Sequence, residues 1–272
     1  MDDINESQIE SYFKFKELLL KEKIVEDFSK FNTQLLLSFL RARKFDLILT
    51  LTMFKNYLSW YKEFKVDEIH LYKVPHINEV YQNYPRTYHK TDKFGRPIYI
   101  EMISMINIDK ILDIIDEDGL VKMMVKDYEY YKKVRLPACS KAAGKAIEQS
   151  LTILCAKDCS LSFFLKVKKM IQKSSQISQD YYPEMLGNLF IINTNFVFKM
   201  MWKVIKLFLE EKTKSKIKIE GYDYLDNLKE FVELENLPSI LGGYCKCEHV
   251  EGGCMYSDIG PWNPNFTSFE SE

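Results

Sequence analysis

The run Leu151-Thr-Ile-Leu-Cys155 is the clearest fold signal in this chain of 272 residues. It is short, almost wholly apolar and contains two β-branched side chains, which is typical of a buried strand. Similar runs occur at residues 97–103, 189–193 and 217–219. Because stretches with helical character separate these runs, the sequence predicts an α/β fold with a mixed or largely parallel sheet.

The intervening stretches at residues 119–134, 141–149, 162–174 and 196–212 are predicted helices. Residues 5–65 contain neither Gly nor Pro and are expected to be helical throughout, with Asp46 placed to cap one helix. The predicted organisation is therefore a helical N-terminal domain at 1–75, an α/β domain at 76–248 and an extended tail at 249–272.

The overall charge balance excludes one large functional class. The formal net charge is −1, whereas a protein that binds nucleic acid through phosphates usually has a basic excess. The charges are nevertheless segregated. Residues 199–218 hold seven Lys and two Glu, and residues 219–272 hold eleven acidic residues and two Lys. This pattern fits a basic surface followed by an acidic one, or simply two solvated segments.

The N-terminal residues are acidic and do not resemble a secretory signal, and no uninterrupted apolar run is long enough to span a bilayer. The six Cys do not suggest a disulfide framework. These features predict a soluble, cytoplasmic protein.

Motifs for nucleotide, calcium or zinc binding and for a nucleophilic serine are missing from the sequence. Cys245, Cys247, Cys254 and His249 lie close together along the chain, but their spacing is not a standard zinc spacing. We therefore predict no enzymatic activity, no metal and no cofactor.

Residues 196–209, Phe-Val-Phe-Lys-Met-Met-Trp-Lys-Val-Ile-Lys-Leu-Phe-Leu, form the most unusual predicted helix. Lys199, Lys203 and Lys206 fall on one stripe, and the rest of the circumference is apolar. Such a helix is either buried on nearly all sides, or it lines an apolar cavity and also meets a bilayer, with Lys reaching anionic lipid. We call these residues the gate helix.

Seven stretches along the chain carry a further signal. They are Leu36-Leu-Ser-Phe-Leu-Arg-Ala-Arg-Lys-Phe-Asp46, Tyr88-His-Lys-Thr-Asp-Lys-Phe-Gly-Arg-Pro-Ile-Tyr-Ile-Glu101, Arg135-Leu-Pro-Ala-Cys-Ser140, Tyr182-Pro-Glu-Met-Leu-Gly187, Ile191-Ile-Asn193, Phe208-Leu-Glu-Glu-Lys-Thr-Lys-Ser-Lys-Ile217 and Ser257-Asp-Ile-Gly-Pro-Trp262. In this order they resemble the CRAL-TRIO lipid-binding family, and within it the members that transfer phosphatidylinositol and phosphatidylcholine. The resemblance implies a CRAL-TRIO domain whose sheet floors an apolar lipid cavity, closed by the mobile gate helix.

The resemblance also implies residue roles. The phosphatidylinositol headgroup would be held at Arg43, Lys44, Pro97, Glu184, Thr213 and Lys216, with Glu184 pairing with Lys44. The phosphatidylcholine headgroup would be held at Tyr88, Tyr99, Tyr128, Ser150, Thr152, Ser178 and Tyr182. The gate and membrane contacts would be Phe196, Phe198, Met200, Met201, Trp202, Lys203 and Lys206. From the residues alone, Arg43 and Lys44 also suit a solvated helix end, and the tyrosines also suit a hydrophobic core.

The resemblance implies a non-enzymatic carrier that exchanges one phospholipid at a time and touches membranes only transiently. The alternatives are a carrier of another hydrophobic ligand, such as a sterol or isoprenoid, and, with less support, a lipid hydrolase. The expected partners are a phospholipid and a membrane surface, without nucleic acid. We expect a monomer in the cytoplasm that visits Golgi or endosomal membranes.

Overall fold

The computed structural model describes residues 4–264, and the chain forms two compact units. One unit comprises the chain up to His70 together with Ile177–Glu184. The other comprises Leu71–Gln176 and the chain from Met185 onward. No single cut in the sequence separates the two units, because a short segment from the second half of the chain returns to the first unit.

The N-terminal unit is built from helices α1 (Glu6–Lys21), α2 (Thr33–Ala42) and α3 (Leu47–Glu63), with 3₁₀ turns at Phe28–Lys30 and Val66–Leu71. Its core contains Phe15, Phe39 and Phe54, whose rings meet edge to face. The expectation of helix throughout 5–65 holds for the three helices but not for the turns between them. Asp46 accepts hydrogen bonds from the backbone N–H groups of the first turn of α3, which confirms its capping role.

The second unit is organised around a five-stranded sheet in the order β1-β2-β3-β4-β5. The strands are β1 (Arg86–Thr91), β2 (Pro97–Met102), β3 (Ser150–Cys155), β4 (Leu186–Ile192) and β5 (Ile217–Ile219). The β1–β2 pair is antiparallel and all other neighbours are parallel. The predicted α/β class and mixed sheet are therefore confirmed.

The helices of this unit are α4 (Ile77–Asn83), α5 (Ile108–Ile114), α6 (Glu117–Tyr130), α7 (Leu136–Ala143), α8 (Leu161–Tyr181), α9 (Phe196–Ile205), α10 (Glu211–Lys214) and α11 (Leu225–Lys229). The last residues of α8 belong to the N-terminal unit. The sequence analysis did not predict β1 or the short helices α4, α5 and α11. The helix expected at 141–149 lies earlier, since α7 ends at Ala143 and is capped by Gly144, whose φ of 64° is left-handed.

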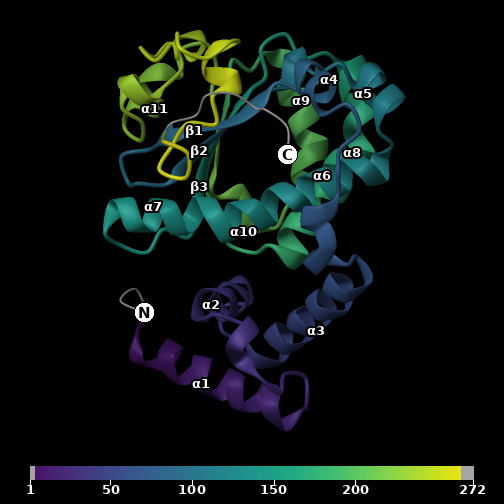
Figure 1. The fold of residues 1–272 in the computed structure, drawn as a ribbon, viewed down its shortest axis with the longest axis vertical. Helices are drawn as coiled ribbons and strands as arrows, with labels where there is room; N and C mark the ends of the chain where they lie inside the picture. The colour runs from purple at the N-terminus through teal and green to yellow at the C-terminus, as the bar shows by residue number, and fades with distance from the viewer. Residues whose placement is uncertain (1–3, 265–272) are drawn as a thin grey trace. The chain divides into compact units, whose positions relative to one another are not determined.

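The two faces of the sheet have different surroundings. One face carries fully buried residues such as Ile98, Ile153 and Phe190, which pack against α11 and the segments that follow it. On the other face, Leu154, Leu189 and Ile217 pack with α9. Figure 1 shows α11 and α9 on opposite sides of the strands.

The C-terminal segment differs from the predicted extended tail over the part that the structure describes. It contains a 3₁₀ turn at Gly253–Tyr256, and the carbonyl of Ile259 accepts a hydrogen bond of 2.6 Å from Lys90 N in β1. Buried contacts hold it there, with Ser257 fully buried. Residues 265–272 of the predicted tail lie outside the described residues. His249 is exposed, and it is His89 of β1 that the fold brings to Cys245, Cys247 and Cys254.

Candidate functional site

The face of the sheet turned toward α9 carries a row of residues aligned across five strands. The register places Tyr88, Tyr99, Thr152, Leu189 and Ile217 side by side. Tyr99, Thr152 and Leu189 are only half-buried, although they lie on central strands whose opposite face is completely buried. A central sheet face that stays accessible is the natural floor of a ligand site. The row combines hydroxyl groups at one end with aliphatic groups at the other.

A polar network lies beside the hydroxyl end of this row. Arg86 pairs with Asp127 of α6 at 2.6 Å, and the hydroxyl of Tyr99 donates a hydrogen bond of 2.7 Å to Glu101. Burial raises the pKa of Glu101 above its usual value, and Tyr99 and Arg86 oppose that shift only in part. Polar groups held in this way can orient a headgroup, because their own positions are fixed by partners.

Arg135 lies beside this row, and the sequence did not indicate its contacts. Its guanidinium lies 4.1 Å from the centre of the Tyr88 ring and pairs with Asp258 at 2.9 Å. A π-helical turn at Tyr131–Arg135 precedes α7. We attribute this turn to Pro137, whose ring cannot fit against the carbonyl of a regular preceding turn. One face of Tyr88 is thus already occupied by a cation of the protein itself.

The predicted phosphatidylcholine residues are divided between the two units. Tyr88, Tyr99, Tyr128, Ser150 and Thr152 belong to the second unit, and Ser178 and Tyr182 belong to the N-terminal unit. Ser150 is buried and its hydroxyl lies 3.5 Å from the carbonyl oxygen of Met185, while Tyr128 is half-buried on α6. Within the N-terminal unit, the buried Tyr182 ring meets Trp60 edge to face.

The predicted phosphatidylinositol residues of the N-terminal unit are Arg43, Lys44 and Glu184. Arg43 ends α2, and Lys44 is an exposed residue in the turn before α3. Lys44 has a φ of 52° and Glu184 has a φ of 65°, both in the left-handed region that costs a residue other than Gly about 1 kcal/mol. Such strain is common where a side chain must be held for a ligand.

The remaining residues of this set, Pro97, Thr213 and Lys216, belong to the second unit. Pro97 is buried at the start of β2. Thr213 and Lys216 are half-buried, and the backbone N–H of Lys216 donates to the carbonyl of Thr213 at 3.1 Å. The ammonium of Lys216 donates a hydrogen bond of 2.7 Å to the carbonyl of Leu186, which fixes the ammonium at the beginning of β4.

The gate helix corresponds to α9 and the 3₁₀ turn Lys206–Phe208. Phe198 and Met201 are buried against the sheet, and Trp202 packs partly with them. On the opposite side, Phe196 and Leu207 are each 74% exposed and Met200 is 42% exposed. Helical spacing places these three within about 40° of one another, beside the exposed Lys203 and Lys206. The helix therefore has two apolar sides and is not buried all round.

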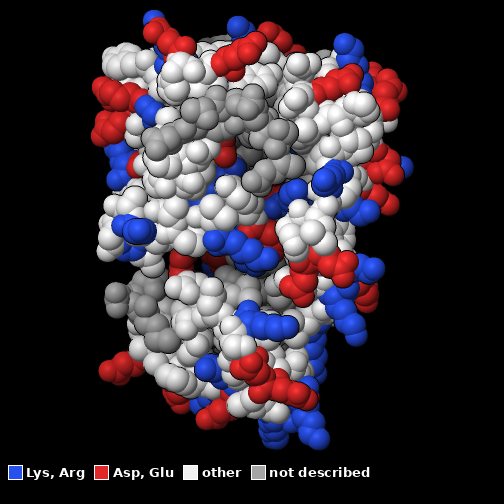
Figure 2. Space-filling model, in the orientation of Figure 1, with Lys and Arg blue, Asp and Glu red and all other residues white. Residues whose placement is uncertain are grey.

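Charge is distributed rather than concentrated on the surface in view. Figure 2 shows Lys and Arg interspersed with Asp and Glu, without one extended basic patch on that face. None of the helices within residues 4–264 combines the length and the apolar character needed to cross a bilayer.

Comparisons with known proteins agree with the family resemblance of the sequence motifs. The CRAL/TRIO domain family matches residues 81–243. A SEC14 cytosolic factor of Kluyveromyces lactis is 42% identical over 84% of this chain and 76% of that protein. A phosphatidylinositol/phosphatidylcholine transfer protein of Arabidopsis thaliana, SFH7, is 38% identical over 96% of this chain and 48% of that protein. This chain thus spans about half the length of the plant relative.

A solved structure shows the shared fold. The crystal structure of Sfh5 matches with a TM-score of 0.67 over 90% of this chain and 89% of that chain, at 16% sequence identity.

Proposed function

Because this chain belongs to the CRAL/TRIO domain family, we propose that it is a non-enzymatic carrier that binds one phosphatidylinositol or phosphatidylcholine and exchanges it at membranes. The observation that carries the proposal is the pairing of an accessible sheet face with a helix that has two apolar sides. We further propose that the protein acts as a monomer in the cytosol and visits Golgi or endosomal membranes.

The energetics favour exchange over simple release. Two acyl chains of about 16 carbons represent roughly 25 kcal/mol of apolar transfer, at about 0.8 kcal/mol per CH₂. A soluble carrier must supply nearly all of this free energy through its own apolar contacts with the acyl chains, so it needs a closed apolar lining. Loading then needs an opening, and the open state exposes apolar side chains that are best satisfied at a membrane. Phe196, Met200 and Leu207 are suited to that contact.

The headgroup residues support two ligands in one carrier. Arg43, Lys44, Thr213 and Lys216 supply the cations and the hydroxyl that a phosphate requires. The tyrosines near the sheet supply hydroxyls and aromatic faces that suit choline. Since Arg135 already covers one face of Tyr88, we assign the choline contact to Tyr99 and Tyr128 in preference to Tyr88.

The test is to identify the ligand directly. The protein is purified without detergent, extracted with organic solvent and analysed by mass spectrometry. We expect phosphatidylinositol and phosphatidylcholine together, in total about one lipid per chain. A sterol or isoprenoid as the dominant species would instead support the alternative carrier. Formation of lysophospholipid from a radiolabelled substrate would support a hydrolase and contradict the proposal.

The exposed apolar stripe of the gate helix gives a second prediction. Phe196→Gln combined with Leu207→Gln should lower the rate of lipid transfer and the affinity for vesicles by about tenfold or more, because burying each side chain contributes about 1.5–3 kcal/mol. Vesicle co-sedimentation and transfer of fluorescent lipid measure the two effects.

The matched control is Ile48→Gln with Leu71→Gln, since Ile48 is 76% exposed and Leu71 is 66% exposed. Both proteins should keep their melting temperatures. Equal loss of transfer in the control protein would mean that general surface hydrophobicity, and not the gate helix, drives membrane contact.

A further inference from the structure

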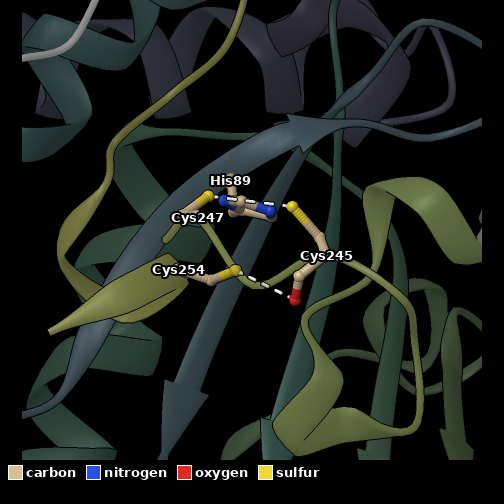
Figure 3. Close-up of side chains that lie close together, drawn as sticks. All are labelled: His89, Cys245, Cys247 and Cys254. Atoms are coloured by element: carbon tan, nitrogen blue, oxygen red, sulfur yellow. Dashed lines mark hydrogen bonds between the residues drawn. The ribbon is translucent and has the colours of Figure 1, made fainter. Parts of the chain in front are cut away.

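Four potential metal ligands converge in the second unit, outside the proposed lipid site. They are His89 of β1 and Cys245, Cys247 and Cys254 of the C-terminal segment. One ligand atom from each residue lies within 4.8 Å of all the others. Figure 3 shows the imidazole ring and the three sulfur atoms gathered in one place. The Cys254 sulfur lies 3.3 Å from the carbonyl oxygen of Cys245. All three cysteines are free thiols.

The spacing of the sulfur atoms fits a metal better than a disulfide. The Sγ atoms of Cys245 and Cys247 are 3.7 Å apart. A tetrahedral zinc ion with Zn–S bonds of about 2.3 Å holds its sulfur ligands about 3.8 Å apart. A disulfide would require an S–S distance of about 2.0 Å. Cys245 and Cys247 are therefore already placed at the separation that a bound zinc would impose.

The hydrogen bonds around His89 leave one ring nitrogen available. The Ser257 hydroxyl donates to the carbonyl of Cys254 at 2.9 Å, so its oxygen accepts from the Nδ1–H of His89 at 2.9 Å. This arrangement leaves Nε2 unprotonated, with a lone pair. His89 is fully buried, and Nε2 has no hydrogen-bond partner within residues 4–264. A buried acceptor without a partner needs an explanation, and a metal ion supplies one.

We propose that His89, Cys245, Cys247 and Cys254 form a structural zinc site. Three thiolates and one imidazole are a set that zinc favours, and four protein ligands leave no open position for catalysis. Ser257 would orient the imidazole through Nδ1, as outer hydrogen bonds do for metal-bound histidines.

The backbone around the cysteines is consistent with this role. Cys247 has a φ of 48°, and Gly252 and Gly253 have φ values of 81° and 67°. These residues reverse the chain so that Cys254 returns to Cys245 and Cys247. The sequence spacing C-x-C-x₆-C was not recognisable as a zinc motif, because the fourth ligand comes from a strand more than 150 residues earlier. A bound zinc would fasten the C-terminal segment to β1.

The first test is the metal content of the protein as purified, without chelators or a histidine tag. Elemental mass spectrometry should find about one zinc per chain. Exchange with Co²⁺ should give the thiolate charge-transfer and strong visible d–d bands of a tetrahedral site. The proposal would be overturned if the purified protein contained no zinc, took up no cobalt and showed six free thiols. A disulfide among these three cysteines would overturn it as well.

Variants assign the ligands. His89→Gln and Cys247→Ser should each reduce the zinc content by about tenfold or more, in line with the loss of a ligand from a closed site. His249→Gln, which changes the exposed histidine next to the cysteines in sequence, and Cys159→Ser, which changes a buried cysteine elsewhere, should keep the zinc. Loss of zinc in His249→Gln with retention in His89→Gln would contradict the assignment. If the ligand variants do not fold, the cobalt spectrum of the unchanged protein still decides.

Discussion

A protein that carries Lys44→Ala and Thr213→Asp together is expected to lose phosphatidylinositol transfer by about 100-fold or more while keeping most of its phosphatidylcholine transfer. Each charged hydrogen bond to a phosphate is worth about 1.5–3 kcal/mol, and 1.4 kcal/mol corresponds to a factor of ten. The change removes one cation and places a carboxylate beside the expected phosphate. Transfer of each labelled lipid between vesicles measures the two activities separately.

The fold should tolerate both changes. Lys44 is exposed in a left-handed turn, where Ala and Lys have similar backbone costs, and Thr213 is half-buried. The matched control is Lys23→Ala with Thr52→Asp. Lys23 is also exposed with a φ of 54°, Thr52 is exposed, and the change in net charge is the same. An equal loss of both lipid activities in the test protein, or the same loss in the control, would contradict the assigned headgroup site.

Replacement of Arg135 by methionine is expected to lower the free energy of unfolding by about 3–5 kcal/mol, because it leaves Asp258 buried without its cation. The side chains of Arg135 and Asp258 are only 9% and 12% exposed, and the guanidinium also lies against Tyr88 and Tyr130. Urea unfolding followed by circular dichroism measures the change.

Two further variants are needed to interpret the result. Arg135→Met with Asp258→Leu removes both charges and should recover part of the loss, since no unpaired carboxylate remains. Lys166→Met breaks an ion pair with Asp109 whose side chains are 52% and 69% exposed, and it should cost at most about 1 kcal/mol. If Arg135→Met lowers the free energy of unfolding no more than Lys166→Met does, the Arg135–Asp258 ion pair does not stabilise this part of the fold.

β2, β3, β4 and β5 were predicted from the sequence because their apolar runs are short and continuous. β1 was missed for a physical reason. Its sequence, Arg-Thr-Tyr-His-Lys-Thr, is polar, and its residues are buried by partners that come from distant parts of the chain. The helix expected at 141–149 was misplaced because Pro137 was not read as a residue inside a helix, where a π-helical turn accommodates it.

The candidate site was predictable only in part. A motif resemblance supplied the headgroup and gate residues, and the structure has the gate helix with apolar residues on two sides. Arg135, Asp258 and His89 were not assigned, because their roles depend on pairs separated by more than 100 residues. No local period or spacing encodes such pairs.

The C-terminal segment has a consequence for the order in which this protein is made. Ser257 bonds to His89, 168 residues earlier, and its neighbour Asp258 pairs with Arg135, 123 residues earlier. During synthesis, β1 and the π-helical turn that ends at Arg135 leave the ribosome long before these partners exist. Until then, His89 and Arg135, which are buried in the folded protein, lack these partners and are either exposed to water or bound to a chaperone. The proposed floor of the lipid site can therefore reach its final form only after translation has passed residue 258, so ribosome stalling before that point would release a protein in which this floor is incomplete.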